Sequence, residues 1–306
     1  MVEVGGATMG TTWSARVIGS EADAGAYAAA VQGACDRVVA QMSPWERDAA
    51  LSRFNALEGG QRLGAPAELL AVLRTALQVA KASGGAFDPT GGELADLWGF
   101  GPRPGPEAPD ALAAEARSRV GWRRLTLGAG GELVQPGGLK LDLNGIAKGY
   151  AADLAARALE SLGLEAFLVE VGGELVGRSV KPDGQPWWVD LEAPPESGLE
   201  PLRVALCDLA VATSGDWRRA FEHAGETLSH TLDPRTGRPS ASGVAAVSVV
   251  HASCMEADAW ATALSALEPE AGVALADAQG LAARIVWRDG DRVREALSGT
   301  IAAMLD

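Results

Sequence analysis

Strand-like and helix-like patterns alternate irregularly along this chain, and their order limits the folds that it can adopt. Apolar residues recur at helical spacing over residues 26–42 and 67–82, whereas residues 13–18 and 167–171 alternate as strands do. Because the order is not a regular strand-helix-strand series, it predicts an α+β fold with mixed sheets and flanking helices. Further strands are expected at 124–127, 132–135, 139–143, 187–191, 202–207 and 244–250, and further helices at 146–162, 256–267 and 270–279.

A proline-rich stretch interrupts this pattern without dividing the chain. Residues 102–109 contain four prolines and a glycine, which is typical of an exposed connector. Too little chain follows before the next strand signals to support a domain boundary, and no repeat of fixed period is present. Hydrophobic residues make up 47% of the 306 positions, enough for a sizeable core. We therefore expect a single domain spanning residues 1–306.

The charge balance and the cysteines restrict the partners and the compartment. Acidic residues number 40 against 26 basic ones, and the net charge of -14 disfavours phosphate backbones and anionic lipid as partners. Three widely separated cysteines suit reduced thiols better than a disulfide framework. The first residues lack a leader pattern, and no apolar run is long enough to span a bilayer. We expect a cytoplasmic protein with no nucleic-acid partner and no membrane span; removal of an export signal is the alternative.

Residues 229–237 combine a histidine, a carboxylate, an arginine and several hydroxyls in one short segment. Pro234 and Gly237 favour a fixed turn there over a helix or a central strand. His230 is one of three histidines in the chain, and an imidazole can take a proton from a hydroxyl near neutral pH. The alternative is that His230 satisfies a loop carbonyl while Asp233 caps a turn. The segment on its own leaves both interpretations open.

Two further groupings could bind a charged ligand. Asp258 and Thr262 stand four residues apart, so in a helix their oxygens share one face and could hold a hard cation such as magnesium. The commoner alternative is an acidic residue favouring the helix dipole and a threonine bonded to its own backbone. Asp142, at a strand end, precedes a helix start where free N–H groups and Lys148 could face a phosphate. There the alternative is a helix capped by Asn144, with a solvated lysine.

Further segments with a recognisable pattern lie along the chain. As isolated features, the glycine pairs at 84–85 and 172–173 are weak signals of a turn that a ligand can approach. The full set comprises residues 9–11, 42–43, 51–55, 86–90, 97–101, 142–153, 172–174, 213–216, 229–237 and 258–262. In number, order and spacing these segments resemble the ApbE-type FAD:protein FMN transferases across nearly the whole chain, and so many collinear matches are highly specific.

Members of that family cleave the pyrophosphate of FAD, release AMP and attach FMN through a phosphoester to a threonine or serine of an acceptor protein. The resemblance implies a magnesium ion, FAD as substrate and an acceptor flavoprotein as partner. It implies His230 as the general base, with Asp233 orienting the imidazole or lying near the phosphates. It implies metal ligation by the backbone carbonyl of Gly145 and by Asp258 and Thr262. The flavin contacts that it implies are Met9, Trp45, Ala86, Phe87, Asp88, Asp142 and Lys148.

The chain departs from the family pattern at three positions. Trp45 stands where a tyrosine commonly stacks on the isoalloxazine, so a stacking face is kept and a hydroxyl contact is lost. Trp13 also replaces a usual tyrosine, and Asn144 a usual glycine or serine. Two other activities fit the same residues: an FAD pyrophosphatase that yields free FMN and AMP, and a protein that binds FAD without chemistry. Oxygen ligands also leave calcium open as an alternative to magnesium.

Overall fold

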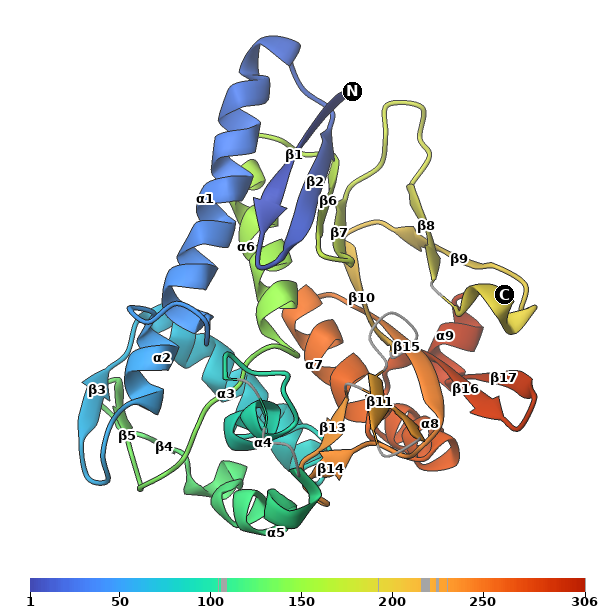
Figure 1. Cartoon of the computed structure of the whole chain (residues 1–306). Helices are drawn as coiled ribbons and strands as arrows, with labels where there is room; N and C mark the ends of the chain where they lie inside the picture. Colours follow the sequence, from blue (N-terminus) through green and yellow to red (C-terminus); the bar gives the residue numbers. More distant parts are fainter. Residues whose placement is uncertain are drawn as a thin grey trace.

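An eight-stranded sheet runs through the molecule (Figure 1). The structure is a computed structural model, and it describes residues 1–103, 105, 109–191, 193–215, 221–223, 226–229 and 231–305. In spatial order its strands are β1 (Val2–Thr8), β2 (Thr11–Val17), β6 (Phe167–Val171), β7 (Glu174–Arg178), β10 (Leu209–Gly215), β15 (Val244–His251), β16 (Ala282–Asp289) and β17 (Arg292–Leu297). The α-helices are α1 (Ala24–Met42), α2 (Ala50–Asn55), α3 (Ala67–Ala82), α4 (Gly92–Leu97), α5 (Pro109–Arg119), α6 (Ala147–Ser161), α7 (Cys254–Ser265), α8 (Pro269–Gln279) and α9 (Gly299–Ala303). Short 3-10 helices, labelled η, are η1 (Glu21–Asp23), η2 (Trp122–Arg124) and η3 (Pro195–Ser197). Smaller pairings join β3 (Arg62–Gly64), β5 (Glu132–Val134) and β4 (Thr126–Leu127), β8 (Trp187–Leu191) with β9 (Leu202–Leu206), β11 (Phe221–His223) with β12 (Glu226–Leu228), and β13 (Leu232–Asp233) with β14 (Arg238–Pro239).

Short connections explain part of the strand pairing in the large sheet. Every neighbouring pair in it is antiparallel. Two-residue turns join β1 to β2, β6 to β7 and β16 to β17, and a connection that short permits only antiparallel neighbours. A parallel pairing occurs as an isolated bridge between Gly91 and Lys140. The α+β class with flanking helices is confirmed, with the parallel component confined to that bridge in the described part of the chain.

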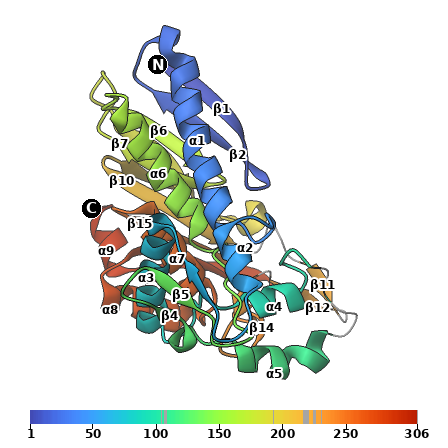
Figure 2. The ribbon, with the colours of Figure 1, turned by 90° about the vertical axis from the view of Figure 1, so that its left-hand side faces the viewer.

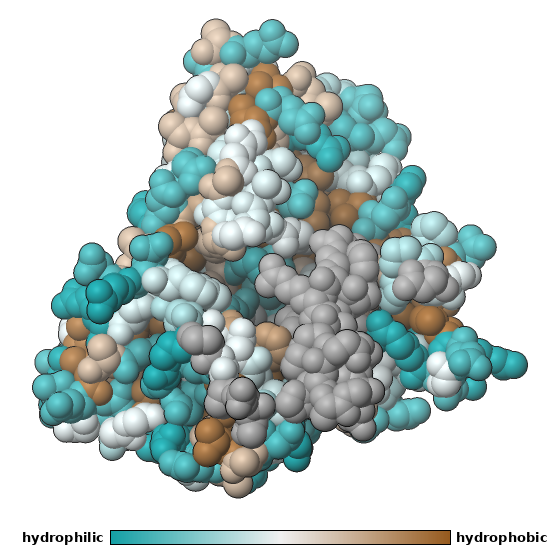
Figure 3. Space-filling view, viewed as in Figure 1, coloured by the Kyte–Doolittle hydropathy of each residue, from teal (hydrophilic) through white to brown (hydrophobic). Residues whose placement is uncertain are grey.

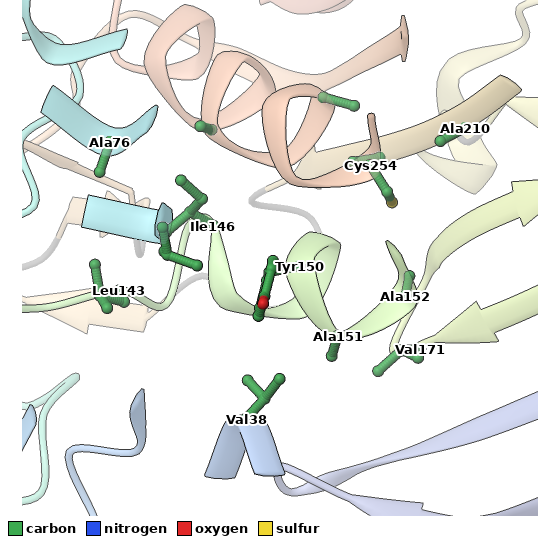
Figure 4. Packing of buried hydrophobic residues seen from close by; sticks show 14 of the residues in the cluster. Val38, Ala76, Leu143, Ile146, Tyr150, Ala151, Ala152, Val171, Ala210 and Cys254 are labelled. Atoms are coloured by element: carbon green, nitrogen blue, oxygen red, sulfur yellow. The ribbon is translucent and has the colours of Figure 1, made fainter. Parts of the chain in front are cut away.

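Hydrophobic residues are packed on both faces of the sheet. In Figure 2, α1 and α6 lie along the strands β1, β2 and β6, and α7 packs on β10 and β15. Alternate strand residues such as Val169 and Val171 point into this helical layer and join the main buried cluster. Figure 4 shows part of that cluster, with α6 lying between α1 and α7. Residues of the opposite alternation, such as Leu168 and Val211, belong to a second cluster with the β8–β9 hairpin and α9.

The strand that we predicted at residues 139–143 does not form, and of the one predicted at 124–127 only Thr126–Leu127 is a strand, whereas the other predicted helices and strands do form. The apolar alternation at 139–143 reflects burial, since Leu139, Leu141 and Leu143 are almost fully enclosed. The side-chain amide of Asn55 takes the place of a neighbouring strand. It accepts from the backbone N–H of Leu141 at 2.7 Å and donates to the carbonyl of Leu141 at 2.9 Å. A side chain from α2 thereby satisfies backbone groups that a ladder would otherwise use.

Helices α6 and α7 cap each other at their N-termini. The cap that we expected at Asn144 is absent, because α6 begins at Ala147 and its N-cap residue makes no side-chain bond. Instead Gly149, in the first turn of α6, donates its backbone N–H to Asp258 of α7 at 2.9 Å. In return, Asp153 of α6 accepts from the first two backbone N–H groups of α7 at 2.9 and 3.0 Å. Tertiary partners thus satisfy donors that helix ends leave free, and the two helices are held in register.

The coloured part of the face shown in Figure 3 is mainly polar. In Figure 3 the hydrophobic residues of the face shown form small patches separated by hydrophilic ones. The large hydrophobic side chains exposed in the described part include Trp45 and Trp188, at 54% and 50%. No helix within the described ranges is both long and apolar enough to cross a bilayer.

Candidate active site

A cavity of about 580 Å³ opens where the ends of β2, β6, β7 and β10 meet the N-terminal turn of α6 and one side of α7. Because neighbouring strands are antiparallel, the end of one strand and the start of the next lie at the same edge of the sheet. The turns at that edge bring Met9 and Gly172 to the cavity, and the end of β10 brings Ser214. The predicted site residues that the structure brings together in its wall are Met9, Trp45, Ala86, Phe87, Asp88, Asp142, Gly145, Lys148, Asp258 and Thr262.

The loop that contains the predicted base contributes to the same cavity through its described residues. His230 itself lies outside the described residues. Its neighbour Thr231 lines the cavity, as does Pro234. Asp233 is not among the residues that line the cavity. Its carboxylate accepts two hydrogen bonds from the Arg235 guanidinium, at 2.8 and 2.9 Å. Arg235 also donates to the carbonyl of Ala266 at 3.0 Å, so Asp233 helps to fasten the loop to the C-terminal end of α7.

Oxygen atoms from α7 and from the segment before α6 face one another. The Thr262 hydroxyl lies 3.4 Å from the carbonyl of Gly145 and 3.2 Å from the Ser214 hydroxyl. Asp258, which is 3% exposed, bonds to α6 rather than to its own helix. A Cβ at position 145 would lie 2.6 Å from Thr262 Oγ1, so only glycine lets this carbonyl approach. The helix-dipole alternative does not describe these contacts, since the Asp258 carboxylate bonds to α6 and the Thr262 hydroxyl faces Gly145 and Ser214.

These oxygens fit a hard divalent cation. Magnesium and calcium prefer carboxylate, carbonyl and hydroxyl oxygens, which are the donors of Asp258, Gly145 and Thr262. The described residues contain no cluster of three or more histidine, cysteine or carboxylate side chains suited to a metal. A cation here would thus depend on the carbonyl and the hydroxyl as well as on the single carboxylate.

Charge in the cavity wall is predominantly negative. Among the lining residues that the structure describes, Lys148 is the sole cationic side chain, and it shares the wall with Asp88, Asp142 and Asp258. Burial raises the pKa of each of these three carboxyl groups above its ordinary value. Burial alone would lower the pKa of Lys148, but the carboxylates of Glu174 and Asp258 outweigh it, so that pKa is raised. An anionic ligand therefore meets one ammonium and needs further positive charge.

The turn that precedes α4 is shaped by Asp88. One oxygen of its carboxylate accepts from the Thr90 backbone N–H at 2.9 Å and from the Thr90 hydroxyl at 2.6 Å. The other oxygen accepts from the backbone N–H of Trp122 at 2.9 Å. Asp88 lines the cavity, but its carboxylate is engaged within the protein. It holds the turn that presents Ala86 and Phe87.

Two residues near this site had no assigned role in our sequence interpretation. Glu174, behind the cavity wall, forms an ion pair with Lys148. Ser214 extends the cluster of hydroxyls around Thr262. The available signal for Glu174 was a carboxylate directly after the Gly172–Gly173 pair, followed by two apolar residues of a strand.

A helix-covered antiparallel sheet with an acidic, oxygen-rich cavity at one edge defines an α+β protein whose cavity has the volume and the polar groups for a large polar ligand. A sequence model of the ApbE family matches residues 9–285. The chain belongs to that family and is an enzyme of the flavin transferase type.

Curated relatives and solved structures agree with this membership. An FAD:protein FMN transferase of Klebsiella pneumoniae is 36% identical over 296 residues, which cover 94% of this chain and 84% of that protein. One from Escherichia coli is 33% identical over 310 residues, 98% of this chain and 88% of that protein. The apo flavinyl transferase ApbE of Pseudomonas stutzeri superposes with a TM-score of 0.91 at 36% identity, covering 99% of this chain and 96% of that one. The flavin transferase ApbE of Vibrio cholerae gives 0.90 at 33% identity, covering 99% and 98%.

Proposed function

We propose that this enzyme transfers FMN from FAD to a threonine or serine hydroxyl of an acceptor protein, in the presence of magnesium, forming a phosphoester and releasing AMP. The observation that carries the proposal is the convergence of segments far apart in sequence on one cavity of about 580 Å³. That cavity holds an ammonium and a set of hard oxygen donors, which is what a dinucleotide diphosphate requires. The names of the curated relatives support the same activity.

The described side chains divide the recognition of FAD among them. Lys148 directs its ammonium at the diphosphate, while the half-exposed indole of Trp45 offers a stacking face for the isoalloxazine. Gly145, Asp258 and Thr262 would hold the magnesium ion, which when bound neutralises charge that develops on the diphosphate. Without that added charge, the three lining carboxyl groups would repel the ligand.

We assign proton transfer to His230. The imidazole takes the proton of the acceptor hydroxyl as that oxygen attacks the phosphorus of the FMN portion. The bond between this phosphorus and the bridging oxygen then breaks, and AMP leaves with that oxygen. The support is the position of His230 between Ser229 and the cavity-lining Thr231.

An assay of AMP release separates this function from its two alternatives. The protein is incubated with FAD and magnesium, with and without candidate acceptor proteins, and AMP and covalently bound flavin are measured. AMP that appears only with an acceptor, together with flavin on that acceptor, is the expected result. AMP without an acceptor would identify a pyrophosphatase, and bound FAD without any AMP would identify a binding protein.

The substitution H230N tests the assigned base. Asparagine preserves much of the side-chain size but cannot take a proton, so transfer should fall by roughly two or more orders of magnitude. The dissociation constant for FAD, followed by flavin fluorescence, should stay within about twofold of the wild-type value because the ligand contacts remain. An undiminished transfer rate would remove His230 from this role.

A further inference from the structure

The turn between β6 and β7 places a buried carboxylate directly behind the cavity wall. Gly172 and Gly173 both have positive φ, +61° and +102°, and both line the cavity. A Cβ at Gly172 would lie 2.8 Å from Thr11 Cγ2 and 3.2 Å from Lys148 Cδ, so glycine is needed for this approach. The chain thereby reverses against the stem of Lys148 and carries Glu174 beneath its ammonium.

Glu174 is almost fully enclosed and incompletely bonded. Its exposure is 1%, and its Oε1 accepts from Lys148 Nζ. Its Oε2 is buried and has no hydrogen-bond partner among the described residues. The side chain of Lys148 is 34% exposed and lines the cavity, whereas Glu174 does not. The pair therefore runs from the protein interior to the cavity, with the ammonium at the open end.

Such an ion pair contributes little to the stability of the folded protein. Taking a carboxylate out of water costs more than one ion pair regains unless every remaining polar atom is also bonded, and here Oε2 is not. The next inward-facing residue of β7, Val176, shows that the strand accommodates an apolar side chain on this face. Burial raises the pKa of Glu174, and Lys148 partly offsets that rise. The Glu174–Lys148 pair is therefore explained by how it places Lys148 rather than by a contribution to stability.

We propose that Glu174 is a positioning residue for phosphate recognition, which fixes the Lys148 ammonium at the cavity wall where the diphosphate of a flavin dinucleotide binds. This inference rests on the proposed function, because it takes FAD as the ligand. Glu174 does not touch the ligand itself and acts through Lys148. It follows that loss of its charge should weaken the binding of a phosphorylated flavin and spare that of a flavin without phosphate.

The test compares FAD with riboflavin on the full chain, with magnesium present and without an acceptor protein, by quenching of flavin fluorescence. In E174Q the amide keeps the size of the side chain and can still accept from Lys148, but the bond is no longer charge-assisted at both ends. The dissociation constant for FAD should rise about tenfold, whereas that for riboflavin should stay within about twofold. A general distortion of the cavity would weaken both ligands alike and would overturn the proposal, as would an unchanged or tighter affinity for FAD.

A double-variant cycle checks that Glu174 acts through Lys148. In a K148M background, the added E174Q change should alter FAD affinity by less than about twofold, because the ammonium that it positions is gone. Fully additive effects would contradict the proposal. E295Q is the matched control, since Glu295 pairs with the buried Arg284 at 2.8 Å on β16 and β17, and neither residue lines the cavity.

If E174Q does not fold, E174D replaces it: the charge is kept but withdrawn by one methylene, and a selective loss of FAD affinity is again expected. If the wild-type protein does not bind FAD, the proposed function fails. If the wild-type protein binds FAD and both variants bind it equally well, only the role of Glu174 fails.

Discussion

At the scale of single residues, the carboxyl groups around the cavity differ in what occupies them. The oxygens of Asp88 and Asp233 are bonded within the protein, so these side chains shape turns. Asp142 accepts one backbone bond from Asn144 at 2.9 Å and otherwise faces the cavity. Residue type alone therefore does not distinguish a ligand-binding carboxylate from a structural one. The hydrogen-bond partners of each carboxylate make that distinction. They also give each carboxylate a different expected response to substitution.

Asp142 gives a prediction of pH dependence. Burial, reinforced by Asp96, raises its pKa in the folded state, so the folded protein holds this proton more tightly than the unfolded chain does. The stability from that proton is present below the ordinary carboxyl pKa of about 4 and is lost as the pH rises through the folded-state value. D142N keeps the acceptor for Asn144 and removes the titration. The Tm of D142N relative to wild type, without FAD, should increase from pH 4 toward neutral pH.

The control for that comparison is D183N, because Asp183 makes the same kind of backbone bond, to Gln185 at 3.0 Å, from an exposed position. A Tm difference for D142N that stays flat or declines as the pH rises would show that burial of Asp142 does not oppose its ionisation.

At the scale of elements, the pair of helices α6 and α7 carries the candidate site. Lys148 belongs to the first turn of α6, and Asp258 and Thr262 to α7. The mutual caps made by Asp153 and Asp258 fix the two helices relative to each other. Close contact is possible because position 149 has no side chain. The geometry of the oxygen cluster is thus a property of the helix pair, and it should respond to any change that separates the two helices.

The glycine between these helices gives a prediction of stability. A Cβ at Gly149 would collide with the Cys254 carbonyl oxygen and lie 2.7 Å from Asp258 Cβ, and a backbone atom cannot move aside cheaply. G149A should therefore lower the free energy of unfolding by about 1–3 kcal/mol, as overpacking does. In G33A, at an exposed position of α1 with no atom within 4 Å, alanine should instead raise it by about 0.5–1 kcal/mol. Urea denaturation measures both, and equal effects at the two positions would contradict this account.

At the scale of the whole molecule, the cavity depends on the complete sheet. Strand ends from residues 2–17 and from residues 167–215 meet at one edge, and α7 reaches the same edge from the C-terminal part of the chain. The main buried cluster likewise includes Val2, Phe54 and Ile285. No short fragment contains the whole wall of the cavity. Binding of the flavin and folding of the chain should therefore be linked.

This linkage predicts one cooperative unfolding transition for a single domain spanning residues 1–306. In calorimetry the van't Hoff enthalpy should equal the calorimetric enthalpy, and FAD should shift the whole transition upward because it binds only the folded state. Two separable transitions, of which FAD moves only one, would instead divide the chain into independent units.

The sequence by itself determined the helices with strong apolar periodicity and the family, and it named ten of the residues that line the cavity, because these depend on local spacing and on the collinear order of motifs. Only the tertiary structure decided that Asn55 replaces a strand partner for Leu141, that Asp258 caps α6, and that Glu174 lies behind Lys148. In each case the two partners are 26 to 109 positions apart in the chain. Burial and hydrogen bonding across such separations are set by how the elements pack, which local propensity does not encode.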